Sequence, residues 1–188
     1  MKRILFAISI FLSFSAFAQD AHLMFKGVSM KGNIGDFILG LMDKGFDLSG
    51  ATEQYAMLEG MFLGTPKTNV AVYPNPHTKN TVMVVAFVEA GETWKSIEEE
   101  YNRVVRLYTE KYGEPSNHEE HFDGDADTGF QKLRRVREKL CRYATTWELA
   151  QGSITIMIMY SEEKYYVTCS YFDKANSEDI SSRSIDDI

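Results

Sequence analysis

The sequence TWKSIEEEYNRVVRLYTEKYGEP, from Thr93 to Pro115, decides the fold because it holds the strongest helical pattern in the chain. Its apolar residues recur at intervals of three and four, which predicts an amphipathic α-helix with one buried face. Thr93 is placed to cap the N-terminus, and Gly113 followed by Pro115 ends the helix. One tryptophan and three tyrosines share the apolar face, and we interpret them as a packing stripe rather than a cofactor site.

Extended segments flank this helix on both sides. Those before it are Gln54–Leu63, Thr68–Tyr73 and Thr81–Glu89, and those after it are Arg142–Leu149, Ser153–Tyr160 and Tyr165–Asp173. Their apolar residues alternate with polar ones, which is the pattern of a strand with one buried face. A further strand is expected over His22–Met30, and shorter helices are expected over Asn33–Phe46 and Gly129–Leu140.

The order of these elements predicts an α+β fold, in which helices pack on one face of an antiparallel sheet. A helix followed by antiparallel strands occurs in both halves, so we expect two pseudo-repeated units, over about 22–90 and 91–174. The units share a single domain, 19–174, since a chain of this length suffices for one medium core. Residues 175–188, ANSEDISSRSIDDI, have too few apolar side chains to fold alone and are expected to form a mobile acidic tail.

The N-terminus, MKRILFAISIFLSFSAFAQD, has the features of a secretory signal peptide. Basic residues precede an apolar run, and Ala16-Phe17-Ala18 has the small-x-small form that signal peptidase reads. The apolar run is shorter than the roughly 20 residues that span a bilayer, and no later run is long enough to do so. We therefore expect cleavage between Ala18 and Gln19, and a mature protein that is periplasmic or secreted.

The chain is acidic, with a formal net charge of −7 at pH 7. Loss of residues 1–18 removes Lys2 and Arg3 and no acid, which takes the net charge to −9. Because Lys and Arg supply most of the non-specific affinity for a phosphate backbone, we expect no nucleic-acid partner. The sequence contains no Gly-rich phosphate loop and no Gly-x-Ser-x-Gly motif, so we expect no cofactor and no catalytic residue.

The chain has two cysteines, Cys141 and Cys169, and export favours a disulfide between them. The expected strand pairing argues against that bond. A two-residue turn at Gln151-Gly152 and a four-residue loop at Ser161–Lys164 produce two apolar rows, namely Trp147, Ile156, Cys169 and Leu149, Ile154, Tyr171. This register separates the cysteines by about 20 Å, whereas a disulfide bridges roughly 7 Å between Cα atoms. We expect two free thiols, with Cys169 in the core.

The stretch HEEHFDGDADTGF, His118 to Phe130, concentrates the residue types that ligate metals. The candidate ligands are His118, His121, Asp123, Asp125 and Asp127. The histidines are three apart rather than four as in the helical zinc-protease motif, and Arg134 stands where a calcium loop requires a bidentate glutamate. We interpret the segment as a solvated acidic loop. The alternative function that it leaves open is a metal-dependent hydrolase or a calcium-binding protein.

The C-terminal strands carry a second set of large side chains on the face turned away from Cys169. These are Met157, Met159, Tyr166 and Phe172. A surface rich in methionine and aromatic residues is typical of a protein interface, whereas a helix packed over it would make it core. Our main hypothesis is an exported, non-catalytic binding module that presents these residues to a protein or peptide partner.

Several short motifs resemble uncharacterised exported proteins of Gram-negative bacteria. They are Phe25-Lys26-Gly27-Val28, Leu58-Glu59-Gly60 with Phe62 and Gly64, Trp94 at the start of the long helix and Lys111-Tyr112-Gly113-Glu114-Pro115 at its end. The tandem helix-plus-sheet plan is similar to that of the β-lactamase inhibitory protein and of PepSY-type domains, over roughly Leu23 to Phe172. This resemblance implies a small binding or inhibitory module rather than an enzyme, and it carries over no catalytic or inhibitory residue.

Overall fold

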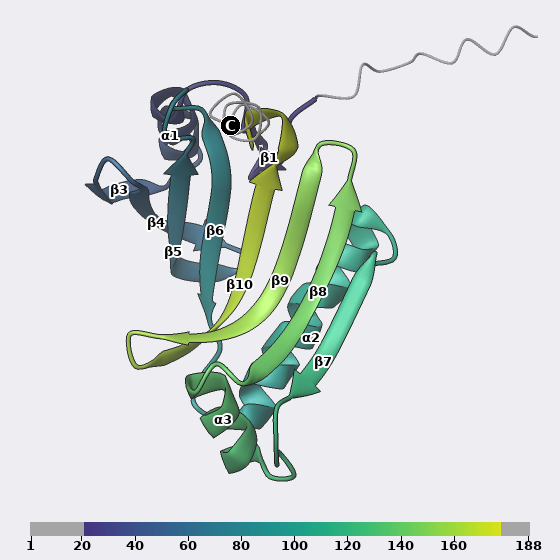
Figure 1. Ribbon diagram of the computed structural model, residues 1–188. Helices are drawn as coiled ribbons and strands as arrows, with labels where there is room; N and C mark the ends of the chain where they lie inside the picture. The colour runs from purple at the N-terminus through teal and green to yellow at the C-terminus, as the bar shows by residue number, and fades with distance from the viewer. Residues whose placement is uncertain (1–20, 178–188) are drawn as a thin grey trace, which may run out of the picture.

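The computed structural model describes residues 21–177, which form a large antiparallel sheet with helices on one side (Figure 1). In chain order the elements are β1 (Met24–Phe25), β2 (Val28–Ser29), α1 (Ile34–Met42), β3 (Asp47–Ala51), β4 (Ala56–Phe62), β5 (Thr65–Pro74), β6 (Thr81–Glu89), α2 (Trp94–Tyr112), β7 (Asn117–Phe122), α3 (Gly129–Arg137), β8 (Cys141–Leu149), β9 (Gly152–Ser161) and β10 (Lys164–Asp173). The main sheet has eight strands in the order β3-β4-β5-β6-β10-β9-β8-β7, and β1 and β2 form a separate pair. All paired strands run antiparallel, which confirms the predicted α+β class.

The sheet is continuous because two parts of the chain that are far apart in sequence pair in its middle. β3 to β6 follow one another in the sheet, as do β7 to β10, and β6 pairs with β10. In this pairing Ala86 lies opposite Cys169. Strand β10, the last of the described strands in chain order, therefore lies in the centre of the sheet, between β6 and β9 (Figure 1).

Helix α2 begins and ends at the residues that the sequence predicts. The Thr93 hydroxyl oxygen accepts a hydrogen bond from the Ser96 amide at 3.2 Å, and Gly113 after the last turn has φ 85°, where glycine is favoured. The buried side chains of α2 are Trp94, Ile97, Tyr101, Val104 and Tyr108. Because α2 packs against β9 and β10, the aromatic stripe is confirmed as packing.

Two rows of buried side chains face the helices. The first row runs from β4 to β9 and comprises Leu58, Val70, Ala86, Cys169 and Ile156. The second runs from β5 to β8 and comprises Val72, Val84, Tyr171, Ile154 and Trp147. The β1–β2 pair covers this core, since the Phe25 ring stacks on Phe62 with centroids 5.1 Å apart and meets Tyr171 edge-on at 5.2 Å.

The predicted registers of the C-terminal strands are half confirmed. Ile156 lies opposite Cys169 and Ile154 opposite Tyr171, as expected. The β8–β9 register is wrong by two residues, because the turn is Ala150-Gln151 and Trp147 lies opposite Ile154 instead of Ile156. Side chains alternate with period two along a strand, so a shift of two leaves every residue on its predicted face.

Three segments differ from their predicted structure. The strand expected over His22–Met30 is a short hairpin with a turn at Lys26-Gly27, and the acidic loop expected from His118 begins instead as strand β7. Strand β3 was not predicted. Both β3 and β7 are edge strands with mostly exposed side chains, so neither has the alternating apolar pattern of a half-buried strand.

Both thiols are free, and Cys169 is fully buried as predicted. Burial raises the pKa of Cys141 to about 11 and that of Cys169 to about 12. The thiolate is the reactive form of cysteine, so both side chains are held in their inert form at neutral pH.

A thiol reagent is therefore expected to leave both cysteines of the folded protein almost unmodified at about pH 8, where well under a hundredth of each is thiolate. Adding guanidinium is expected to expose both and to release two equivalents of the reporter. Absorbance of an aromatic disulfide reagent, followed with and without denaturant, measures this. Rapid modification of Cys169 in the folded protein would show that its strand is not packed as described.

The described chain ends are tied together by buried polar groups. Asp173 has 0% exposure and accepts hydrogen bonds from the Leu23 and Asn176 amides at 2.8 and 3.0 Å. The Asn176 side chain donates to the carbonyls of Met30 and Thr81, each at 2.8 Å. The predicted mobile tail therefore starts too early at 175, since Asn176 belongs to the folded domain. The predicted signal peptide and residues 178–188 lie outside the described residues.

Candidate functional site: the open face of the sheet

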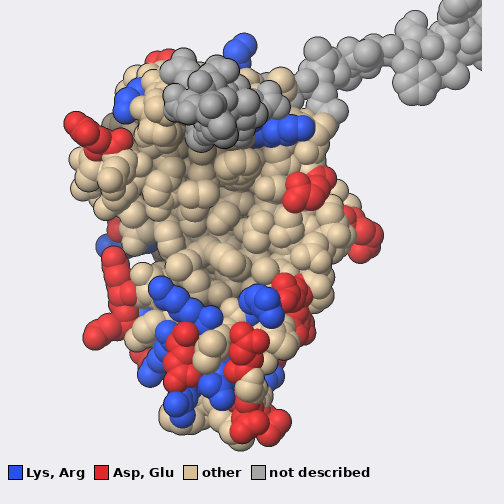
Figure 2. Space-filling model, in the orientation of Figure 1, with Lys and Arg blue, Asp and Glu red and all other residues tan. Residues whose placement is uncertain are grey.

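The face of the sheet that is turned away from the helices carries a broad band of uncharged side chains. Its central row crosses six adjacent strands, from β4 to β8, and comprises Met57, Ala71, Val85, Ser170, Thr155 and Thr146. Ala71 and Val85 are buried by their neighbours, and the others in the row are half-buried. Figure 2 shows this face as a tan area, with the charged side chains gathered around it and over α3.

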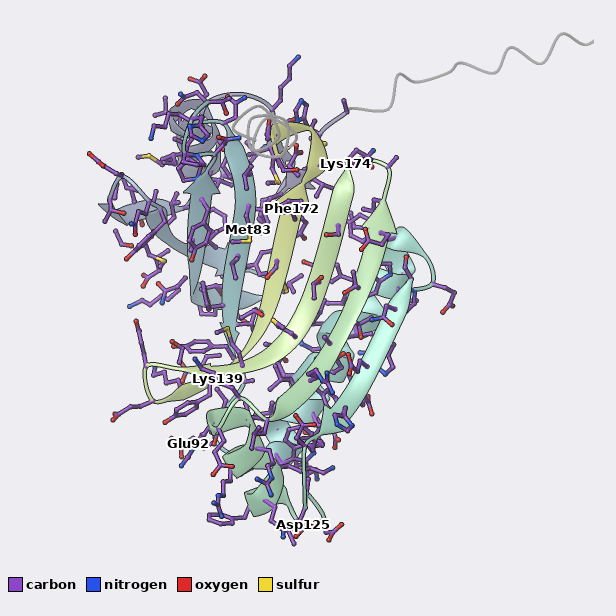
Figure 3. The ribbon with its side chains drawn as sticks, in the orientation of Figure 1. Met83, Glu92, Asp125, Lys139, Phe172 and Lys174 are labelled. Atoms are coloured by element: carbon purple, nitrogen blue, oxygen red, sulfur yellow. The ribbon has the colours of Figure 1, made fainter. Side chains whose placement is uncertain are left out.

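Two parallel rows widen the band on either side of the centre. One comprises Tyr73, Met83, Phe172 and Ser153. The other comprises Asn69, Phe87, Thr168, Met157 and Ala144. Carboxylates occur only where these rows end, at Glu148 in the first and at Glu59 and Glu119 in the second. Met83 and Phe172 lie side by side on β6 and β10 (Figure 3). The band combines apolar contact area with hydroxyl and amide groups.

All four predicted binding residues lie on this open face. Phe172 is 41% exposed and Met157 39%, and Met159 is half-buried. Tyr166 is only 8% exposed, because its ring meets Phe87 edge-on with centroids 5.8 Å apart. Two of the four side chains are thus available to a partner as they stand, and a third partly so.

Sequence reasoning missed the members of the band that come from the first half of the chain. These are Met57, Asn69, Ala71, Tyr73, Met83, Val85 and Phe87. Their alternation with buried residues on β4 to β6 marks them as facing away from the core. Their place beside Phe172 and Tyr166 depends on the β6–β10 pairing, and no local signal in the sequence specifies which strands pair.

The band borders a cavity of about 620 Å³ at one end, beside Asn69, Phe87 and Tyr166. The same three residues line a smaller cavity of about 100 Å³ that extends to Met57. At the larger cavity the Lys164 ammonium donates to a Glu89 carboxylate oxygen at 2.8 Å. This bond raises the pKa of Lys164, and burial raises that of Tyr166. The wall of the larger cavity is mixed, since the Phe87 and Tyr166 rings stand beside Asn69 and the charged Glu59, Lys67, Glu89 and Lys164 side chains, and it could receive one projecting polar or aromatic side chain of a partner.

The three rows contain several side-chain hydroxyl groups. No carboxylate or imidazole stands within the three rows among the described residues, and at the end of the first row Glu148 lies opposite Ser153. The hydroxyls bond locally, as Thr146 and Thr155 do at 3.0 Å and Thr168 does to the Met157 carbonyl at 3.3 Å.

The two histidines of the metal hypothesis lie on opposite faces of β7. His118 pairs with Thr145 on the helix face, and its Nδ1 is 2.7 Å from the Thr145 hydroxyl. His121 pairs with Arg142 on the open face, and its Nε2 is 2.8 Å from an Asp123 oxygen. Successive residues of a strand point to alternate sides, so histidines three apart cannot meet at one ion.

The aspartates beyond β7 are not assembled around a common centre either. The Arg135 guanidinium lies against Gly124 and donates to the Asp125 carbonyl at 3.3 Å, so a cation of the protein already occupies this bend. Within residues 21–177, no three His, Cys, Asp or Glu side chains are grouped closely enough to hold a metal ion. Figure 3 shows Asp125 far from the open face, at the end of the molecule near α3.

His118 belongs to a structural network instead. The Thr145 hydroxyl that it contacts also lies 2.6 Å from the Tyr101 hydroxyl, and Thr145 is fully buried. Burial raises the pKa of Tyr101 to about 12. These contacts join β7 and β8 to α2.

Comparison with known proteins returns no relative: no protein family, no curated protein and no solved structure matches this chain. Among residues 21–177, no helix is both long and apolar enough to cross a membrane.

Proposed function

We propose that this protein is an exported, non-catalytic binding module that holds a protein partner on the open face of its sheet. One observation carries the proposal: an uncharged band crosses six adjacent strands and no described element covers it. The band mixes apolar and uncharged polar side chains, and exposed methionine and aromatic residues such as Met157 and Phe172 are found on protein surfaces mainly where another molecule covers them.

The composition of the band favours a protein over other ligands. Methionine and aromatic side chains are enriched in the centres of protein interfaces, where charged residues are depleted. Phe172, Met157 and Met83 supply that centre, and the acidic residues stand at its ends. An acidic chain with an uncharged binding face has no means of neutralising a nucleic-acid backbone.

Two finer features belong to the same proposal. The proposal of export is supported by the basic residues, the apolar run and the Ala16-Phe17-Ala18 sequence, from which we expect a mature N-terminus at Gln19 and a location in the periplasm or outside the cell. A two-unit architecture, with the plan that resembles the β-lactamase inhibitory protein, is supported by the strand order, in which α1 precedes β3 to β6 and α2 precedes β7 to β10.

Changing Phe172 and Met157 together to aspartate is expected to weaken partner binding by about 100-fold or more, because each is an exposed apolar side chain, one in each row that flanks the central row. To identify the partner, a photoreactive phenylalanine analogue is placed at position 172 and cross-linked in living cells. Affinity of the purified pair is then measured by calorimetry for the natural chain and the double variant.

Phe130 provides the matched control, since it is 78% exposed but lies on α3, away from the open face. The Phe130→Asp variant is expected to bind the partner normally, and the analogue at position 130 is expected to give no specific cross-link. If the double variant keeps its thermal midpoint and its full affinity, the open face is not the binding site.

A further inference from the structure

A separate cavity, of about 170 Å³, lies on the helix side of the sheet between the β1–β2 turn and the last two turns of α2. Part of its wall is apolar and comes from Phe62, Leu63 and Leu107. This volume is below the roughly 300–1,000 Å³ of sites for drug-sized ligands, so the cavity fits only a small molecule or a short alkyl chain.

The charged residues that line this cavity are both cationic. They are Lys26 in the β1–β2 turn and Lys111 in the last turn of α2, and among residues 21–177 no carboxylate lines the cavity with them. Neither ammonium group makes an ion pair with a residue of the described chain. The Lys111 Nζ lies 4.9 Å from the centre of the Tyr112 ring, which keeps it at the cavity. Both exposed ammonium groups are therefore available to a ligand at this cavity.

Lys111 also has a purely structural role, because a cation in the last turn interacts favourably with the helix dipole and stabilises the helix. Lys26 has no such role. Its φ is +53° and that of Gly27 is +77°, a turn in which asparagine is the favoured first residue and lysine is strained. Leu63, on the facing wall, also has a positive φ of 49°. Lys26 and Leu63 are each the first residue of a two-residue hairpin turn, so two tight turns, Lys26-Gly27 and Leu63-Gly64, fix the backbone on this side of the cavity.

The inner end of the cavity is polar but neutral. The Tyr108 and Tyr171 hydroxyls lie 2.5 Å apart, and both rings are buried. Burial raises the pKa of each phenol well above its ordinary value, so neither places a negative charge near the cavity. The half-buried Tyr112 adds a third phenol beside Lys111. The lining thus combines an apolar wall, neutral hydroxyls and two free cations.

We propose that this cavity binds a small amphipathic carboxylate. The apolar part of the ligand packs on Phe62, Leu63 and Leu107, and its carboxylate interacts with the Lys26 and Lys111 ammonium groups. A single negative charge suits two lysines, which act as point charges, whereas the cavity lining offers no arginine fork for a phosphate. This site is independent of the open face, which lies on the other side of the sheet.

The test is a titration of the ¹⁵N-labelled protein with hexanoate, with hexanol and acetate as probes that lack the charge or the chain. Hexanoate is expected to shift the amide signals of Gly27, Leu63 and Tyr112 at concentrations up to about 10 mM, and to bind about tenfold more tightly than either control. Equal binding of hexanol and hexanoate, or no shift of these signals, would overturn the proposal.

A variant with both Lys26→Gln and Lys111→Gln is expected to lose about tenfold or more in hexanoate affinity while binding hexanol unchanged. The matched control is Lys95→Gln, an exposed lysine in the first turn of the same helix, which is expected to bind as the natural chain does. Retained hexanoate affinity in the double variant contradicts the assignment of the two cations, and it does so without bearing on partner binding at the open face.

Discussion

Replacing Trp147 with alanine is expected to lower the free energy of unfolding by about 3–5 kcal/mol, as large-to-small changes of a core tryptophan do. The side chain is 1% exposed and packs against the Tyr108 ring at 5.8 Å. Its indole N–H donates to the Gly113 carbonyl at 2.8 Å, directly beyond the end of α2. The substitution therefore opens a cavity beneath the helix and also leaves a carbonyl without its donor.

Urea unfolding followed by far-ultraviolet circular dichroism measures this loss. The free energy of unfolding of the Trp147→Phe variant is expected to lie between those of the natural chain and of Trp147→Ala. Phenylalanine keeps most of the packing but loses the hydrogen bond, which is worth about 1 kcal/mol. Glu148→Ala, one residue further on and on the other side of β8, is the control and is expected to change stability by less than about 0.5 kcal/mol. A loss of under 1 kcal/mol in Trp147→Ala would mean that α2 is not anchored here.

The elements that could be predicted are those whose signal is local. Helix α2 has caps at both ends and an apolar residue at every turn, so its bounds followed from the sequence. The β9–β10 register followed from its turn and its apolar rows. The β8–β9 register was wrong by two because a glycine was taken into the turn, whereas Gly152 pairs with Leu149 as the first residue of β9.

Elements whose stability comes from distant neighbours could not be predicted. All five residues of β3 are exposed, and it is a strand only because its backbone pairs with β4. In β7, the sequence NHEEHF is polar and acidic, and its ladder with β8 decides its conformation. Charged and short strands are common at sheet edges, where they prevent pairing with other molecules.

The metal hypothesis and the binding hypothesis differ in how far they depend on knowing the conformation and the pairing of each segment. Histidines three apart share a side of a helix but lie on opposite sides of a strand, so the hypothesis for His118 and His121 required knowing the conformation of their segment. Met157 and Phe172 were placed on the open face by alternation alone, which any strand obeys. The extent of the band was not predictable, since it results from the pairing of β6 with β10.

Replacing Asp173 with alanine is expected to cost about 3–5 kcal/mol, since removing one partner of a buried polar cluster leaves the others unsatisfied. Its carboxylate is inaccessible to water and accepts from the Leu23 amide at 2.8 Å and the Asn176 amide at 3.0 Å. It also lies 3.1 Å from His22 Nδ1. One side chain thus fixes the segment before β1 to the end of β10, and its loss is expected to expose the N-terminal hairpin to proteases before the sheet unfolds.

The Asp173→Asn variant separates the acceptor role from the charge. An asparagine keeps one oxygen for an amide donor but turns an N–H₂ group toward the second, so a loss of about 1–3 kcal/mol is expected. Lys174→Ala, at the next and exposed position, is the control for changes at this strand end. Urea unfolding gives the energies, and limited proteolysis with mass spectrometry locates the first cut. If Asp173→Ala is first cut inside the β9–β10 hairpin rather than before Val28, the carboxylate does not anchor the N-terminal segment, and the covering of the core by β1 and β2 must have another cause.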